Sequence, residues 1–226
     1  MAVPRIFVVI AAYNEAQVIA DVVAGVIRAG YRVIVVDDGS RDHTGDAAAN
    51  AGAAVLQHPI NLGQGAALQT GIECALRQGA DIIVTFDADG QHRTADVERL
   101  IAALHAHGAD FALGSRFLGD ALNQPLSRRI MLKLATVFTR LTTGLRVTDT
   151  HNGLRAMTRR GASALSLRQN RMAHASEILH QIAESRLKFV ETPVTIEYSA
   201  YSLAKGQTVG DALVILTDLA ARRLHR

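Results

Sequence analysis

The chain alternates short runs of β-branched residues with longer stretches of helical periodicity, and this alternation limits the folds it can adopt. The predicted strands are residues 5–12, 32–38, 53–57, 81–87 and 110–115. The predicted helices are residues 15–29, 65–78 and 94–105, and another follows the cap candidates Asp42 and Thr44. Continuous apolar strands separated by helices are typical of a mostly parallel sheet that is covered on both faces. We therefore expect an α/β fold, with residues 1–226 in a single domain.

The composition narrows the class of protein further. Hydrophobic residues make up 49% of the chain, enough for a sizeable core, and the single cysteine, Cys74, cannot form an internal disulfide. We expect a reduced, cytoplasmic protein. Aromatic residues make up only 4%, which argues against a base-stacking platform for nucleic acid. The apolar start runs into a polar loop and no run of 18 apolar residues occurs, so neither a signal peptide nor a membrane-spanning helix is predicted.

Polar residues follow every predicted strand at the point where the strand ends. They are "YNE" at 13–15, "DDGSRDHT" at 37–44, "NLGQGAA" at 61–67, "DADGQH" at 87–92 and "GSRF" at 114–117. Ligands of open α/β sheets bind outside the carboxyl ends of the strands. We therefore expect these five segments to meet in one functional cleft.

The segment "DADGQH" carries the strongest single signal. Asp87 and Asp89 repel each other unless something shares their charge. If the strand continues, both side chains point the same way, where they could ligate a hard divalent cation together with diphosphate oxygens. His92 is either a further ligand or a residue at the start of the next helix.

Two other strand ends are weaker signals by themselves. Asp38 either ends a strand in ordinary turn chemistry or accepts hydrogen bonds from a ribose or a nucleobase. Gly63 and Gly65 either let backbone amides approach an anion or let a helix pack closely on the sheet. Neither pattern is a P-loop or a dinucleotide fingerprint.

Taken in order, six segments resemble the successive motifs of the inverting family-2 glycosyltransferases with a GT-A fold. They are "AAYNE", "VVDDGSRDHT", "NLGQGAA", "FDADGQH", "GSRF" and "DTHNGLRAM", and the resemblance spans residues 5–205. It is closest to the dolichyl- or polyprenyl-phosphate sugar transferase branch. The resemblance implies a nucleotide-sugar donor (UDP- or GDP-sugar), a Mg²⁺ or Mn²⁺ cofactor, and a polyprenyl phosphate acceptor. Ala11 and Gln64 depart from the residues common in the family, which leaves the base and the sugar open.

The resemblance also implies roles for individual residues. The donor-binding positions are Ala12, Tyr13, Glu15, Asp38, Gly65, Asp87, Ala88, Arg155 and Lys205. The metal positions are Asp87, Asp89 and Gln91, and the catalytic positions are Asp89, Asp149 and Arg116. Lys205 is either near the donor diphosphate or a solvated loop residue, in a segment, 198–207, that resembles a late loop of this branch.

The acceptor side leaves two alternatives open. Arg116 with Arg128 or Arg129 could clamp a phosphate, because guanidinium matches phosphate bidentately; otherwise Arg128 and Arg129 form a solvated helix start. Asp149 is either a base or a residue that orients Arg155 or the donor. A base is needed only if the acceptor is a saccharide hydroxyl, since a phosphate is already ionised.

Two segments are candidates for contact with a membrane or with a small transmembrane partner. In residues 127–145, a basic set stands opposite one apolar face, which consists of Ile130, Met131, Leu134, Val137, Phe138 and Leu141. The default interpretation is a core-packed helix, and the alternative is a helix on an anionic membrane surface. A predicted helix at 209–224 repeats the pattern. We expect peripheral association with the inner face of the cell membrane.

Three rival functions are considered. Within the same family, the acceptor could be a saccharide hydroxyl. A haloacid-dehalogenase-type phosphatase is suggested by "FDADG", but Gln91 stands where that family usually has threonine or valine. A non-catalytic scaffold for a membrane partner is the third, and the intact pair Asp87 and Asp89 argues against it.

Overall fold

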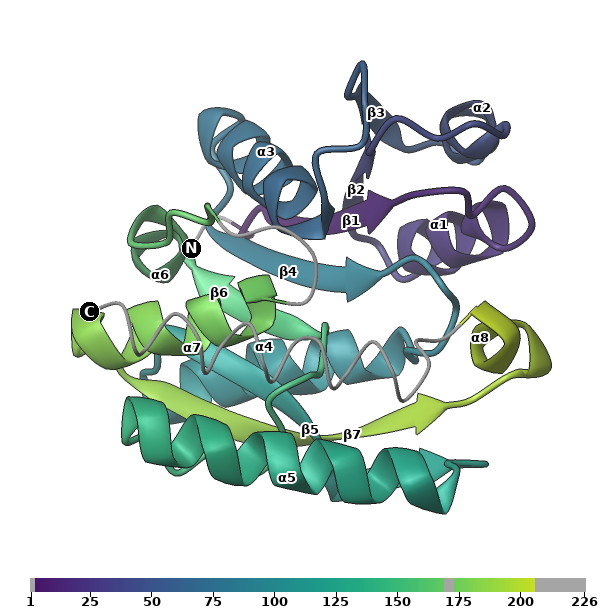
Figure 1. Ribbon diagram of the computed structural model, residues 1–226. Coiled ribbons are helices and arrows are strands. Elements are labelled where there is room, and N and C mark those ends of the chain that lie inside the picture. The colour runs from purple at the N-terminus through teal and green to yellow at the C-terminus, as the bar shows by residue number, and fades with distance from the viewer. Residues whose placement is uncertain (1–2, 169–172, 206–226) are drawn as a thin grey trace.

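The structure is a computed structural model that describes residues 3–168 and 173–205 (Figure 1). Seven strands form one sheet in the order β3-β2-β1-β4-β6-β5-β7. The strands are β1 (Ile6–Ala12), β2 (Arg32–Asp37), β3 (Ala54–Gln57), β4 (Ile82–Asp87), β5 (Phe111–Leu122), β6 (Arg155–Thr158) and β7 (Phe189–Glu197). The helices are α1 (Ile19–Arg28), α2 (Thr44–Asn50), α3 (Gln64–Arg77), α4 (Ala95–His107), α5 (Leu126–Thr143), α6 (Arg159–Ser163), α7 (Ala173–Ser185) and α8 (Ala200–Lys205).

The sheet is mostly parallel, which confirms the α/β fold predicted from the sequence. Strand β1 pairs in parallel with β2 and β4, β2 pairs in parallel with β3, and β5 pairs in parallel with β7. Only β6 runs antiparallel, to both of its neighbours β4 and β5. The carboxyl ends of β1, β2, β3 and β4 therefore lie along one edge of the sheet.

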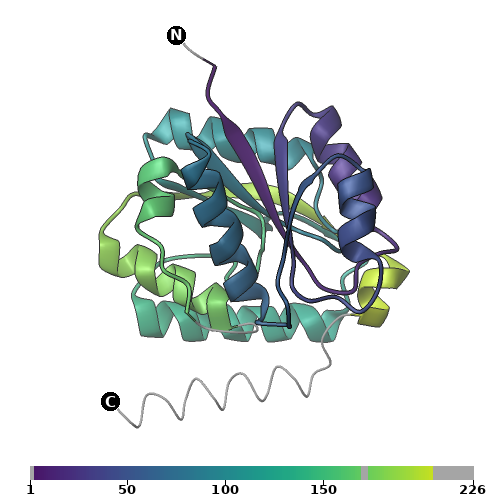
Figure 2. The same ribbon diagram turned by 90° about the horizontal axis from the view of Figure 1, so that it is seen from above.

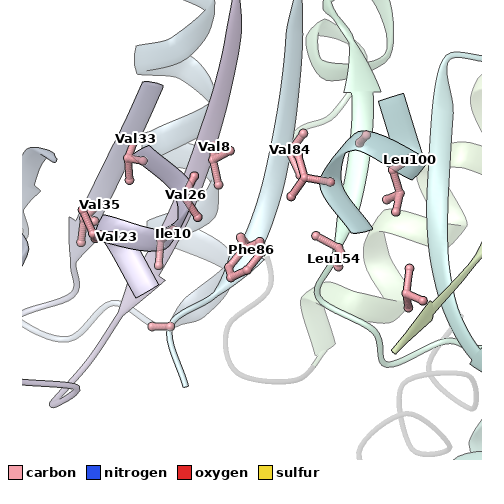
Figure 3. Close-up of a cluster of buried hydrophobic side chains, with 14 of the residues drawn as sticks. Val8, Ile10, Val23, Val26, Val33, Val35, Val84, Phe86, Leu100 and Leu154 are labelled. Carbon is pink, nitrogen blue, oxygen red and sulfur yellow. The ribbon is translucent and has the colours of Figure 1, made fainter. Parts of the chain in front are cut away.

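Helices cover both faces of the sheet (Figure 2), and each face has its own apolar cluster. One cluster joins β1, β2 and β4 to α1 and α4, and Figure 3 shows its members Val8, Ile10, Val26, Phe86 and Leu100. The other joins the opposite face of the same strands to α3, α6 and α7. Because alternate residues of a strand point to opposite faces, Val8 belongs to the first cluster and Val9 to the second.

Several predicted boundaries differ from the structure. Helix α1 begins at Ile19 and not at residue 15, because the Glu15 carbonyl first accepts the N–H groups of Val18 and Ile19 in a turn. Strand β5 continues to Leu122, seven residues beyond the prediction. Strands β6 and β7 and helices α6 and α7 were not predicted, and α8 occupies part of the expected 198–207 loop. The predicted helix at 209–224 lies outside the described residues.

The core-packed interpretation of the helix at 127–145 is wrong. The side of α5 that packs on the protein carries Leu132, Thr136 and Thr139. The two threonines have short side chains that allow close approach, and the Thr136 hydroxyl donates a hydrogen bond to the Leu132 carbonyl at 2.8 Å. Four of the six residues of the predicted apolar face are exposed instead: Ile130, Leu134, Val137 and Leu141. Within the described parts of the chain, no helix is long and apolar enough to cross a bilayer.

Candidate active site

All five predicted polar strand ends contribute to one cleft of about 450 Å³. Its volume lies within the range of small-molecule sites. The lining residues at the strand ends include Ala12, Tyr13, Glu15, Asp38, Asn61, Gly63, Gln64, Asp87, Ala88, Asp89, Gln91, His92 and Arg116. The later part of the chain adds Arg128, His151, Asn152, Gly153, Arg155, His174, Ala175, Ile196 and Ser202. The sequence therefore located the cleft, but it assigned no role to His151, Asn152 or Gly153.

Asp87 and Asp89 both line the cleft, and their surroundings shift their pKa values in opposite directions. Asp87 ends β4, and its Oδ2 lies 2.8 Å from His92 Nε2. Burial opposes its ionisation, but the hydrogen bond with His92 and the electrostatic attraction of His92 and Arg155 outweigh burial and hold the pKa of Asp87 below its usual value. Asp89 lies in the turn after the strand and accepts the Gln91 backbone N–H at 3.1 Å. Burial, and then the negative charge of Asp87, raise the pKa of Asp89 to about 6.

The residues at this position fit a divalent cation that binds together with other ligands. Asp87, Asp89 and Gln91 offer oxygen atoms, which Mg²⁺ and Mn²⁺ prefer. Burial, and then repulsion by Asp87, raise the pKa of Asp89, and a bound cation would offset both effects. Among the residues with described positions, no three His, Cys, Asp or Glu side chains form a metal site by themselves. Further ligands would have to come from water or from a bound diphosphate.

Gly153 brings the backbone of residues 151–154 into close contact with the acidic pair. A Cβ atom at Gly153 would overlap the Asp87 carboxylate. The Gly153 carbonyl also accepts a hydrogen bond from Thr85 Oγ1 at 2.6 Å, which ties the segment to β4. Only a residue without a side chain therefore leaves Asp87 in its observed position.

Arg116 is a fixed part of the cleft wall. Its Nε donates to Asp149 Oδ2 at 2.6 Å, and its Nη1 donates to the Tyr198 hydroxyl at 2.6 Å. Its Nη2 donates to the His151 carbonyl, also at 2.6 Å. Burial works against the charge, but the Asp149 carboxylate outweighs it and raises the pKa of Arg116. Arg116 thus presents a permanent positive charge that cannot swing freely.

Asp149 is buried behind Arg116 and does not line the cleft. Besides the Arg116 side chain, its Oδ2 accepts the Arg116 backbone N–H at 3.1 Å. Glu191 on β7 holds the same segment in place, because its Oε1 accepts the Thr148 backbone N–H at 2.7 Å. This geometry favours an orienting role for Asp149, with Arg116 as the residue that it orients.

The two arginines at the start of α5 are placed differently. Arg128 lines the cleft, with its Cζ 5.0 Å from the centre of the Tyr198 ring, a cation–π contact. Arg129 is exposed and does not line the cleft. Of the three arginines predicted to clamp a phosphate, Arg116 and Arg128 therefore both line the cleft.

Arg155 adds a third cation from β6. It lines the cleft, it is only 3% exposed, and within the described chain its Nη1 has no hydrogen-bond partner. Burial lowers the pKa of Arg155, and the charges of Asp87 and Asp149 oppose that change. Asn152 Nδ2, also in the cleft wall, is a second buried donor without a partner among the described residues. Buried donors of this kind are costly unless a ligand accepts from them.

The predicted donor-side residues Glu15 and Asp38 also line the cleft. Glu15 accepts a hydrogen bond from the Tyr201 hydroxyl at 2.7 Å, which ties the loop after β1 to α8. Asp38 lines the cleft, and its carboxylate accepts the backbone N–H groups of Leu62 at 2.9 Å and Gly63 at 2.7 Å. It therefore fixes the loop that carries Asn61, Gly63 and Gln64 into the cleft.

Two predicted donor residues are not seen in the cleft wall. Gly65 is buried in the first turn of α3, where it does not line the cleft. Lys205 ends α8, but its side chain lies outside what the structure describes.

Comparison with known proteins places the fold and the site in context. The profile described as "Glycosyl transferase family 2" matches residues 7–165. The UDP-N-acetylglucosamine–dolichyl-phosphate N-acetylglucosaminyltransferase of Methanococcus voltae is 33% identical over 92% of this chain and 92% of its own. The polyprenol monophosphomannose synthase of Mycolicibacterium smegmatis is 30% identical over 98% of this chain and 89% of its own.

A solved structure shares the fold. The glucosyl-3-phosphoglycerate synthase of Mycobacterium tuberculosis, crystallised with Mg²⁺ and uridine diphosphate, has a TM-score of 0.72 at 20% identity, over 93% of this chain and 74% of that chain. The similarity covers most of the described residues, so the GT-A architecture expected from the sequence is confirmed.

Proposed function

Because the chain belongs to glycosyl transferase family 2, we propose that this glycosyltransferase moves a sugar from a nucleotide diphosphate sugar to a polyprenyl phosphate. The names of two relatives that align over nearly the whole chain support the acceptor class, since one acts on dolichyl phosphate and the other makes polyprenol monophosphomannose. The donor of the first relative is a UDP-sugar by name. We propose the same general donor class for this chain, with the base and the sugar left open.

The arginines of the cleft carry the proposal for a phosphate acceptor. Arg116, Arg128 and Arg155 all line the cleft, and Arg155 Nη1 lacks a partner within the described chain. A second anionic ligand beside the donor diphosphate would satisfy these charges. The alternative, a saccharide hydroxyl, requires a carboxylate base, and the candidate Asp149 is already bound to Arg116 behind the cleft wall. Both observations support the phosphate over the hydroxyl.

The proposed reaction is a single displacement with inversion. An ionised oxygen of the acceptor phosphate attacks the anomeric carbon, the bond from this carbon to the donor diphosphate breaks, and no proton has to be removed. Arg116 and Arg128 would hold the attacking phosphate, and Arg155 would neutralise charge between the two phosphate groups. Asp87 and Asp89, with Gln91, would hold a divalent cation, which when bound stabilises the departing nucleotide diphosphate.

A transfer assay with labelled nucleotide sugars tests the proposal. We expect label in chloroform-extractable lipid when polyprenyl phosphate is present with Mg²⁺ or Mn²⁺, and no label in lipid after chelation with EDTA. Asp89→Asn should lower the rate by about 10²- to 10³-fold, because it removes a charge that holds the cation. Asp46→Asn is the matched control, since Asp46 is an exposed carboxylate on α2 away from the cleft.

Two outcomes would contradict the proposal. Label in a soluble glycan but not in lipid would move the acceptor to a saccharide hydroxyl. No transfer from any UDP- or GDP-sugar to any acceptor, with a folded protein, would support the non-catalytic scaffold instead.

A further inference from the structure

Helix α5 presents an apolar stripe to solvent. Its members recur at spacings of four, four, three and four residues, which places them on one side of a helix. They are Leu126 (71% exposed), Ile130 (52%), Leu134 (61%), Val137 (52%) and Leu141 (76%). Single exposed apolar residues are common on protein surfaces, but a continuous stripe of five along one helix marks an interaction site. We call these five residues the α5 stripe.

The α5 stripe is bordered by positive charge. Arg129, Lys133 and Arg140 are exposed, and each directly precedes a member of the stripe. Helical geometry places these three cations in a row along one flank of the stripe, between it and the buried side of the helix. Helix α5 carries no Asp or Glu at all. The surface is therefore complementary to one that is both apolar and negatively charged.

The core of the protein does not explain the stripe. Neither of the two apolar clusters contains a residue of α5, and the helix is attached through Leu132, Thr136 and Thr139. The stripe thus contributes little to folding, although apolar residues on a solvent-exposed helix face lower solubility. A binding partner accounts for them better than packing does.

We propose that the α5 stripe and its row of cations dock the protein on the surface of a bilayer that contains anionic lipids. An amphipathic helix of this kind lies in the plane of the interface, with apolar side chains among the acyl chains and cations among the headgroups. Arg128, in the first turn of the same helix, lines the cleft. Docking through α5 would therefore hold the acceptor side of the cleft beside the headgroup layer. This role of docking rests on the proposed function, because a polyprenyl phosphate in a bilayer has its phosphate in the headgroup layer.

Vesicle binding by the full chain tests the proposal without donor or acceptor. Co-sedimentation would compare vesicles of phosphatidylcholine with vesicles of equal parts phosphatidylcholine and phosphatidylglycerol. We expect stronger binding to the anionic vesicles, and a loss of at least about tenfold in the double variant Leu134→Glu with Val137→Glu. The matched control is Val3→Glu with Ile60→Glu, which places the same charges on exposed residues away from α5. Circular dichroism would show that both variants are folded, as expected for exposed positions.

Each alternative partner of the α5 stripe predicts a different experimental result. Binding that persists in the α5 double variant would overturn the proposal, because another segment would then contact the lipid. A dimer by light scattering that the same variant dissociates would assign the stripe to a second copy of the chain. Absence of vesicle binding by the unaltered protein would also overturn it.

The vesicles contain no polyprenyl phosphate and the assay contains no nucleotide sugar, so this result is independent of the transfer assay. Failure of transfer with vesicle binding intact would count against the proposed function alone.

Discussion

Tyr198 organises two of the arginines that line the cleft. It is 2% exposed, its hydroxyl accepts from Arg116 Nη1 at 2.6 Å, and its ring lies under Arg128. We expect Tyr198→Phe to remove the acceptor for Arg116 while keeping the ring, and so to raise the acceptor KM about 5- to 10-fold through the loss of one charge-assisted hydrogen bond. Tyr198→Leu should raise it further, because the cation–π contact is lost as well.

Steady-state kinetics with each substrate varied separately would check this positioning role. The donor KM should stay unchanged in both variants, since Tyr198 makes its hydrogen bonds with Arg116 and Gln124 and not with the predicted metal ligands Asp87 and Asp89. Tyr31→Phe is the control, a partly buried tyrosine that packs against the first apolar cluster away from the cleft. Equal increases in the donor and acceptor KM would indicate general damage to the fold, and would contradict the specific role.

The sequence predicted the residues of the cleft better than their mutual contacts. Strand-end position placed Asp87 and Asp89 at one edge of the sheet, because parallel strands end together. It also placed Arg116 in the cleft, although β5 runs on past Arg116 to Leu122. It could not pair Arg116 with Asp149 and Tyr198, which lie 33 and 82 positions further along the chain. Such contacts depend on how β6 and β7 join the sheet, and this is set by tertiary packing.

At the scale of elements, the first half of the chain was predictable and the second half much less so. Strands β1, β2 and β4 are continuous apolar runs bounded by turn residues, which is a strong local signal. Strand β6 reads RAMT, with a charged residue at one end and a polar residue at the other, so it is not an apolar run. Strand β7 contains Pro193, which usually argues against a strand. Strand β7 tolerates the proline because it lies at the edge of the sheet. Periodicity found the apolar face of α5 but could not tell whether it faces the core or the solvent.

The close approach of residues 151–154 to β4 gives a prediction at the element scale. Gly153→Ala would add a Cβ where the Asp87 carboxylate lies, so either the segment or Asp87 must move. We expect a loss of activity of about 100-fold, because a displacement of this size misaligns the metal-binding pair. The free energy of unfolding should fall by only about 1–3 kcal/mol, as is typical of overpacking.

Activity and urea unfolding of the same variants would separate the two effects. Gly25→Ala on α1 is the matched control, because a Cβ there makes only an ordinary contact with Thr94 Oγ1 at 3.5 Å. The control should keep full activity and be as stable as the unaltered protein or slightly more so. Full activity in Gly153→Ala would show that Asp87 does not need its observed position.

At the scale of the whole molecule, His151 should make folding stability depend on pH. Burial lowers the pKa of His151 to about 4, whereas an unfolded chain has a histidine pKa of about 6.5. Between these values the unfolded chain binds a proton that the folded protein does not. The free energy of unfolding therefore falls as the pH is lowered from about 6.5 towards 4, by about 3 kcal/mol from this residue. Above about 6.5 the contribution is constant, since His151 is then neutral in both states.

Urea unfolding between about pH 4.5 and 7.5 would isolate this contribution if the protein is compared with His151→Gln. Other groups titrate in the same interval, but they are common to both proteins, so the difference between the two curves reports on His151. We expect this difference to shift by about 2 kcal/mol in favour of the variant as the pH falls, because glutamine has no proton to gain. For the control His105→Gln, at an exposed position of α4, the curve of unfolding free energy against pH should run parallel to that of the unaltered protein. A His151→Gln curve that also runs parallel would mean that His151 can become protonated without unfolding. The wall of the cleft would then admit a positive charge beside Arg116 and Arg155, which its burial among them argues against.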